Sequence, residues 1–140
     1  MNARVADTAS GGNELNGELL RRARAARVYD VAHETALGET PLLSARLGAR
    51  VLLKREDRQT VFSFKLRGAY NRMVRLDAAQ RARGVIAAPA GNHAQGVALA
   101  AAKLGIRTTT VMPVTAPGVK VDAVRRFSGA FVEVVLTGLD

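Results

Sequence analysis

Short apolar runs alternate with amphipathic segments of about ten residues along the second half of this chain, and the alternation restricts the possible folds. Runs at 85–88, 108–112 and 131–136 have the length and composition of buried strands. Between them, segments 93–104 and 119–127 carry apolar residues at helical spacing. Repeated strand–helix–strand units join parallel strands by right-handed crossovers. We therefore expect an α/β fold with a mainly parallel sheet and flanking helices.

The first half of the chain contains fewer expected elements. Residues 1–17 are rich in Gly, Asn, Ala and Ser without periodicity, which favours a mobile leader. Leu, Ala and Arg then indicate an amphipathic helix over 18–33, and an apolar run flanked by charges indicates a buried strand at 50–54. The apolar spacing further predicts a helix from about residue 63 to residue 74, with Lys65 in its first turn.

Composition excludes several classes of site and partner. Cysteine is absent and His33 and His93 are the two histidines, so we expect no metal site. No stretch approaches the roughly 18 consecutive apolar residues of a membrane helix, which favours a cytoplasmic protein with no membrane partner. The net charge is +9, but the arginines are spread along the chain and aromatic residues are few. We therefore expect no nucleic-acid partner.

Two segments are expected where parallel α/β sheets bind ligands, beside the carboxyl ends of strands and the N-termini of helices. The first is SFKLRGA at 63–69, which contains one of four lysines in the chain. The second is GNHAQG at 91–96, directly after an expected strand. From the residues alone, Lys65 is also explained as an ordinary exposed lysine, and Gly91-Asn92 as an ordinary capped turn.

The same segments closely resemble motifs of the threonine dehydratases, which belong to the tryptophan-synthase β-like fold type of pyridoxal phosphate enzymes. KREDRQ at 54–59 followed by SFKLRGAY at 63–70 resembles the cofactor-lysine motif of that family. AGNHAQG at 90–96 resembles its asparagine loop, and MP at 112–113 with KVDAVR at 120–125 matches a third stretch. Three motifs in the right order are far more specific than one short pattern.

The resemblance implies a role for each residue of these motifs. Lys65 forms the Schiff base with pyridoxal 5'-phosphate and later removes the α-proton of the substrate. Asn92 donates a hydrogen bond to the phenolic oxygen of the cofactor ring, and Phe64 packs beside that ring. Backbone N–H groups of the loop hold the substrate carboxylate. The substrate-binding positions implied are Pro89, Ala90, Gly91 and His93.

The implied reaction is the β-elimination of threonine (or serine), which gives 2-oxobutanoate and ammonia from threonine in isoleucine biosynthesis. A small amino-acid substrate is then the expected partner, and family members are expected to form homo-oligomers. Two alternatives stay open. One is a related enzyme such as threonine synthase or serine racemase, and the other is an inactive remnant that survives as a partner-binding module.

Two departures from the family pattern bear on the site. Pro89 stands where the family usually has a serine whose hydroxyl and N–H bind the substrate carboxylate, and proline supplies neither group. Ala90, in contrast, agrees with dehydratases and not with serine racemases. Family members also continue well beyond the position of Asp140, with the loop that binds the cofactor phosphate and the serine that faces the pyridine nitrogen.

We therefore expect an N-terminal fragment of such an enzyme. Its expected parts are a mobile leader at 1–17, the leading portion of the large domain at 18–62, and a small α/β domain at 63–140. The small domain contains the cofactor lysine and the asparagine loop. The strand at 50–54 is expected to lack neighbours.

Overall fold

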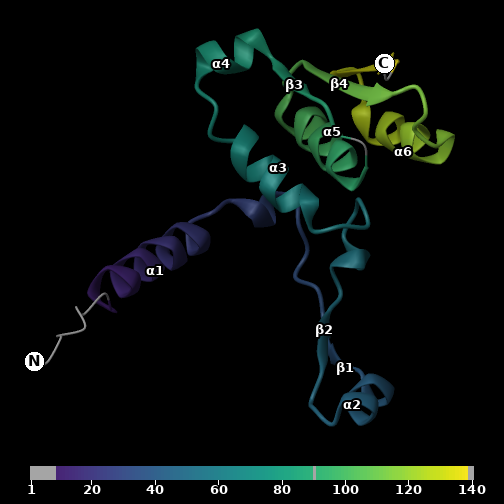
Figure 1. The fold of residues 1–140 in the computed structure, drawn as a ribbon. Coiled ribbons are helices and arrows are strands. Elements are labelled where there is room, and N and C mark those ends of the chain that lie inside the picture. The colour runs from purple at the N-terminus through teal and green to yellow at the C-terminus, as the bar shows by residue number, and fades with distance from the viewer. Residues whose placement is uncertain (1–8, 90, 139–140) are drawn as a thin grey trace, which may run out of the picture.

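The computed structural model describes residues 9–89 and 91–138 of the chain (Figure 1). Two short 3-10 turns, η1 (Val28–Asp30) and η2 (Glu56–Arg58), interrupt the first half. The helices and strands in chain order are α1 (Ala9–Arg24), β1 (Leu37–Glu39), α2 (Pro41–Leu47), β2 (Leu52–Lys54), α3 (Lys65–Met73), α4 (Ala78–Arg83), β3 (Val85–Ala87), α5 (Asn92–Leu104), β4 (Thr108–Pro113), α6 (Gly118–Ser128) and β5 (Val132–Thr137).

The second half of the chain forms a three-stranded parallel sheet in the order β3-β4-β5, with α5 and α6 against one face (Figure 1). Alternate residues of β4 are buried under these helices, as a period of two requires for a strand covered on one face. The predicted α/β fold with a mainly parallel sheet is confirmed. Each predicted strand and helix of this half is present within one or two residues of its expected ends.

Helix α3 packs against α5 and buries the face that its apolar spacing predicted. Its buried residues are Leu66, Ala69, Tyr70 and Met73. The last three form one cluster with Val97, Ala100 and Ala101 of α5 and with Ile106 after it. Leu66 belongs to a separate cluster, with Ala32 and Val61. Gly105 ends α5 in the left-handed conformation at φ 64°, where a glycine avoids the strain of a side chain.

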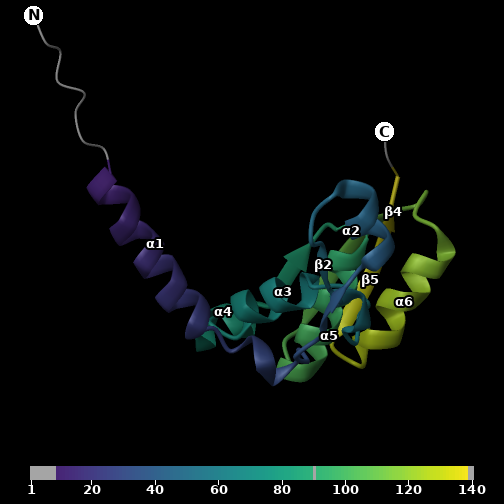
Figure 2. The same ribbon diagram turned by 90° about the horizontal axis from the view of Figure 1, so that it is seen from below.

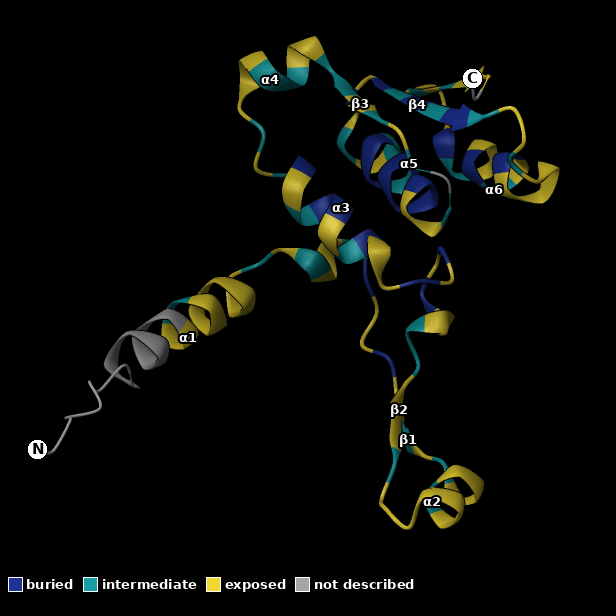
Figure 3. Cartoon of the chain, viewed as in Figure 1, coloured by how far each residue is buried: buried dark blue, intermediate teal, exposed yellow. Residues whose placement is uncertain are grey.

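Strands β1 and β2 pair antiparallel and project with α2 away from the α/β unit in Figure 1, so that in Figure 2, seen from below, they overlap that unit. The prediction of a buried strand at 50–54 is wrong, because all three residues of β2 are exposed (Figure 3). The pair stands alone, so no layer of the described chain covers it. The prediction that this strand lacks neighbours is also wrong, because β2 pairs with β1. Gly38 lies in β1, and Pro41 takes the first helical position of α2, where proline is well suited.

Helix α1 runs over residues 9–24, in place of the expected 18–33. The part of the expected leader that the structure describes is therefore helical, and residues 1–8 lie outside the described residues. Beyond α1, the chain is tied to α3 at η1, where the Tyr70 hydroxyl donates to Asp30 Oδ2 at 2.9 Å. Among the described residues, no helix combines the length and the apolar character needed to cross a membrane.

Candidate active site

Lys65 lies in the first turn of α3, as predicted, where it is the first residue, and its side chain is exposed. The Ser63 hydroxyl accepts the backbone N–H of Lys65 at 3.2 Å. The Lys65 amine lies 5.3 Å from the centre of the Phe64 ring, which is itself 57% exposed. The neighbouring Val61 and Leu66 are fully buried. The chain therefore holds the backbone on both sides of the lysine while its amine stays accessible.

The second predicted segment begins α5. Gly91 occupies the position before the helix and Asn92 is its first residue, so the expected Asn cap is replaced by a glycine without a capping side chain. The first N–H groups of a helix lack partners within the helix and carry partial positive charge. Asn92 and His93 are exposed beside them. Pro89 is half-buried, and Ala90 lies outside the described residues.

The two segments come together through Gly96 of α5. A Cβ at Gly96 would lie 3.0 Å from the Cα and from the backbone nitrogen of Leu66, and 3.2 Å from the carbonyl carbon of Lys65. Any larger residue would push the start of α3 away from α5. The absence of a side chain at Gly96 thus sets how close the Lys65 backbone lies to the first turns of α5.

A cavity of about 270 Å³ lies between α3, β3 and α5. Gly68 and Arg72 line it from α3, three and seven residues after Lys65, and therefore from the same flank of the helix as the lysine. His93 lines it from the start of α5. The rest of the lining is mainly apolar and comes from Ala69, Met73, Val85, Ile86, Ala87 and Val97.

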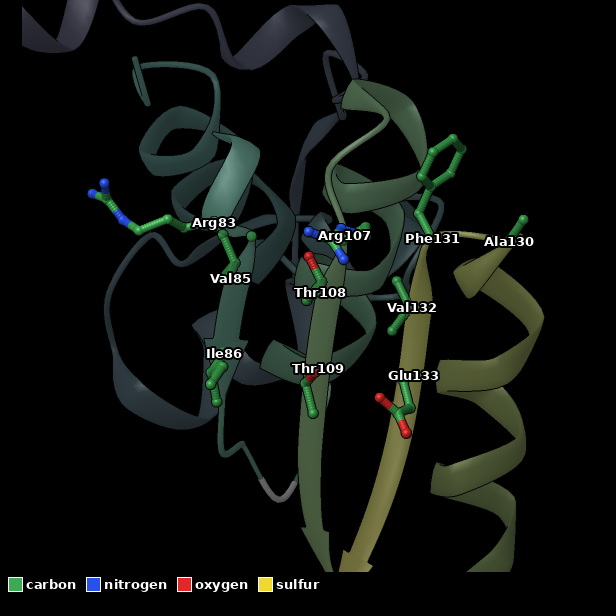
Figure 4. A pocket seen from close by; sticks show the side chains of 11 residues that line it. Arg83, Val85, Ile86, Arg107, Thr108, Thr109, Ala130, Phe131, Val132 and Glu133 are labelled. Carbon is green, nitrogen blue, oxygen red and sulfur yellow. The ribbon is translucent and has the colours of Figure 1, made fainter. Parts of the chain in front are cut away.

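A larger cavity, about 380 Å³, lies at the N-terminal ends of β3, β4 and β5 and shares Val85 and Ile86 with the smaller one (Figure 4). Figure 4 shows Ile86, Thr109 and Glu133 projecting from neighbouring strands on the face that α5 and α6 leave open. Parallel α/β sheets bind their ligands at the carboxyl ends of the strands. This cavity contains none of the residues that the motifs single out, so the smaller cavity is the better candidate for an active site.

The sequence did not predict a partly buried polar network next to Lys65. The Glu56 carboxylate accepts hydrogen bonds from the Thr35 hydroxyl at 2.6 Å and from Arg67 Nε at 2.8 Å. Arg67 holds the pKa of Glu56 well below its ordinary value of 4.5, at about 2, with further lowering by Thr35 and Gln59 and opposition from burial. Glu56 and Arg67 belong to the quoted motifs, but their pairing across eleven positions has no signal in the spacing.

The chain matches the family described as "Pyridoxal-phosphate dependent enzyme" over residues 30–140. It is 59% identical over 121 residues to the L-threonine dehydratase biosynthetic IlvA of Burkholderia multivorans. This match covers 86% of this chain and 24% of that protein. It is 52% identical over 129 residues to the protein of the same name in Escherichia coli. That match covers 92% of this chain and 24% of the relative. The chain thus spans about a quarter of the length of these relatives.

Solved structures agree with this family and with the fold. The processed form of threonine deaminase isoform 2 from Solanum lycopersicum superposes with a TM-score of 0.79 at 47% identity, over 99% of this chain and 36% of that one. Maize serine racemase superposes with a TM-score of 0.78 at 33% identity, over 88% of this chain and 36% of that one. The chain is a homologue of biosynthetic threonine dehydratases and belongs to the family of pyridoxal-phosphate dependent enzymes.

Proposed function

We propose that this chain forms the lysine-bearing part of a threonine (or serine) dehydratase, a lyase that performs β-elimination with pyridoxal 5'-phosphate. The observation that carries the proposal is the exposed amine of Lys65 at the start of α3, held against the first turns of α5 through Gly96. The names of the relatives at 52–59% identity support threonine as the substrate.

The residues present fit one side of the cofactor. Its aldehyde needs a lysine amine, and Lys65 offers one that makes no side-chain hydrogen bond to the other described residues. Its phenolic oxygen needs a hydrogen-bond donor, and Asn92 provides an exposed carboxamide at the start of α5. We propose that the phosphate is held by sequence corresponding to the remainder of the longer relatives.

When bound, the cofactor withdraws electrons from the α-carbon of the substrate, and the protein supplies position and electrostatics. Lys65 takes up the α-proton with its amine. Asn92 orients the cofactor ring by donating from its carboxamide. N–H groups at Gly91 and His93 bind the substrate carboxylate, since the start of α5 offers unpaired donors. Phe64, whose ring centre lies 5.3 Å from the Lys65 amine, packs beside the cofactor ring.

We further propose that residues 18–62 are the leading portion of a larger domain and that residues 63–140 form the small one. Leu37, Leu42 and Leu53 on the projecting β1–α2–β2 segment are between 48% and 89% exposed, as expected for residues that pack against another part of the protein. We propose a cytoplasmic location and a homo-oligomer for the complete enzyme. Plant relatives are named chloroplastic, so location differs among relatives.

An inactive, partner-binding remnant is the second candidate, and Pro89 is the observation that favours it. Proline at this position removes an N–H and a hydroxyl from the carboxylate site. The two candidates differ in what the chain does when extended by the remaining sequence of the Burkholderia relative. A dehydratase then converts threonine to 2-oxobutanoate, and a remnant does not.

The test of the proposal is a 2-oxoacid assay on this extended protein. We expect turnover that needs pyridoxal phosphate and that is abolished by Lys65→Ala. Lys120→Ala is the matched control, because Lys120 is an exposed lysine in the first turn of α6 and carries no proposed role. Turnover that survives Lys65→Ala, or complete inactivity of the folded extended protein, contradicts the proposal.

A further inference from the structure

The Glu56 carboxylate accepts several hydrogen bonds, and the donors lie in separate segments of the chain. Arg67 donates to it twice, from Nε to Oε2 at 2.8 Å and from Nη2 to Oε1 at 3.1 Å. The Thr35 hydroxyl donates to Oε1 at 2.6 Å, and Gln59 Nε2 lies 3.2 and 3.3 Å from the two oxygens. The side chains of Glu56 and Arg67 are 17% and 22% exposed, so water competes weakly for these bonds.

The backbone of His33 connects this pair to the N-terminal half of the chain. Its carbonyl oxygen accepts from Arg67 Nη2 at 3.1 Å and from Gln59 Nε2 at 2.8 Å, and its N–H donates to Gln59 Oε1 at 2.9 Å. Gln59 is 1% exposed. The guanidinium of Arg67 also lies 5.1 Å from the centre of the Tyr29 ring. Through its contacts with Glu56, His33 and Tyr29, Arg67 therefore connects α3 to η2 and to segment 29–35.

Arg67 holds α3 from the flank opposite Lys65. A helix turns about 100° per residue, so side chains two positions apart diverge by about 200°. Packing fixes the face between the two flanks, through Leu66, Ala69 and Met73. Ala69 and Met73 pack against Val97, Ala100 and Ala101 of α5. Arg67 adds a restraint on the other flank, because rotation of α3 about its axis would break its hydrogen bonds to Glu56 and to the His33 carbonyl.

We propose that Glu56 and Arg67 are positioning residues for Lys65, whose ion pair fixes the rotation of α3 so that the amine faces the start of α5. The inference rests on the proposed function, since a fixed direction matters only for a lysine that must meet a cofactor. Glu56 acts through Arg67 and the helix. It does not itself touch the reacting atoms.

The test uses the 140-residue chain and two readouts. The first is the nuclear Overhauser effect between an α-hydrogen of Gly96 and the amide hydrogen of Leu66, which reports helix placement without any cofactor. The second is reductive labelling by excess pyridoxal phosphate and borohydride, followed by peptide mass spectrometry. The ratio of label on Lys65 to label on exposed Lys120 corrects for general changes in reactivity.

Three variants weaken the pair by different amounts: Glu56→Gln, Arg67→Lys and Thr35→Val. Glu39→Gln is the matched control, because it removes a carboxylate from an ion pair with Arg50 whose side chains are 60% and 76% exposed. We expect Glu56→Gln and Arg67→Lys to weaken the Overhauser effect and to lower the Lys65 to Lys120 ratio about tenfold, the scale of a lost charge-assisted hydrogen bond. Thr35→Val should give a smaller loss, and Glu39→Gln none.

The proposal is overturned if the Overhauser effect and the ratio stay unchanged in these variants while the melting temperature falls, because the pair then serves stability alone. Absence of the Overhauser effect in the unsubstituted chain also overturns it. Should Glu56→Gln fail to fold, Arg67→Lys and Thr35→Val carry the same test. If the unsubstituted chain shows no preference for Lys65, the proposed function fails, and the Overhauser measurement still decides whether the pair positions the helix.

Discussion

Gly96 of α5 lies directly against the backbone of Leu66, the residue after Lys65. A Cβ at Gly96 would approach Leu66 N and Cα to 3.0 Å, whereas a Cβ at Gly68 of α3 meets nothing within 4 Å. Both glycines lie inside helices, where alanine is otherwise favoured by roughly 0.5–1 kcal/mol. The two positions therefore separate helix propensity from interhelical contact.

We predict that Gly68→Ala raises the free energy of unfolding by roughly 0.5–1 kcal/mol. Gly96→Ala should lower it by about 1–3 kcal/mol, because the atoms that the new methyl group meets are backbone atoms that cannot turn aside. Chemical denaturation of the two variants and the parent chain checks both signs. Equal effects of the two substitutions would show that α3 and α5 do not approach each other in this way.

The pKa of Glu56, lowered from 4.5 to about 2 by Arg67, makes stability depend on pH. A carboxylate whose pKa is lower in the folded chain stabilises the fold above its unfolded pKa, and that stabilisation is lost as the pH falls. We predict that Glu56→Gln costs roughly 3 kcal/mol at neutral pH, since each pKa unit corresponds to about 1.4 kcal/mol.

The difference in unfolding free energy between the parent chain and Glu56→Gln should shrink as the pH falls from about 4.5 to about 2. Glu39→Gln provides the control, because the Glu39 side chain is 60% exposed and an exposed ion pair contributes little to stability. Urea titrations at several pH values measure both variants. A constant difference for Glu56→Gln across this range would mean that the ionised carboxylate is not what stabilises the network.

The spacing of apolar residues predicted the α/β unit correctly, because the residues at helical or strand spacing are the ones that are buried there. The spacing of Leu66, Ala69, Tyr70 and Met73 identified the buried face of α3, and Gly105 identified the end of α5. The exposure of β2 could not be predicted in this way. An apolar run shows that a strand tends to be covered, but what covers it depends on the tertiary structure, and the described chain places only β1 beside it.

The site was predictable in part. The apolar pattern predicted one helix from about residue 63, with Lys65 in its first turn, and another from about residue 93. The structure begins α3 at Lys65 and α5 at Asn92, so both predictions are confirmed within two residues. The roles of Lys65, Asn92 and Phe64 come from the family resemblance and stay predictions. The pairing of Glu56 with Arg67 has no local signal, because it exists only once η2 and the first turn of α3 have folded against segment 29–35.

Pro89 provides a prediction about substrate binding. In the chain extended by the remaining sequence of the Burkholderia relative, we predict that Pro89→Ser lowers KM for threonine more than it raises kcat. A serine restores an N–H and a hydroxyl, and each hydrogen bond to a charged group contributes about 1.5–3 kcal/mol. Steady-state kinetics with threonine measure the two constants. Identical kinetics for both proteins would show that residue 89 does not contact the substrate carboxylate.

The proposed function requires that Lys65 forms the covalent bond to the cofactor. Borohydride reduction of the extended protein at one equivalent of pyridoxal phosphate, followed by peptide mapping, locates the modified lysine. Lys54, Lys103 and Lys120 are the other three lysines of the 140-residue segment. We expect the label on Lys65 and its loss in Lys65→Ala. A label that lies mainly on one of the other three lysines, or outside this segment, contradicts the claim.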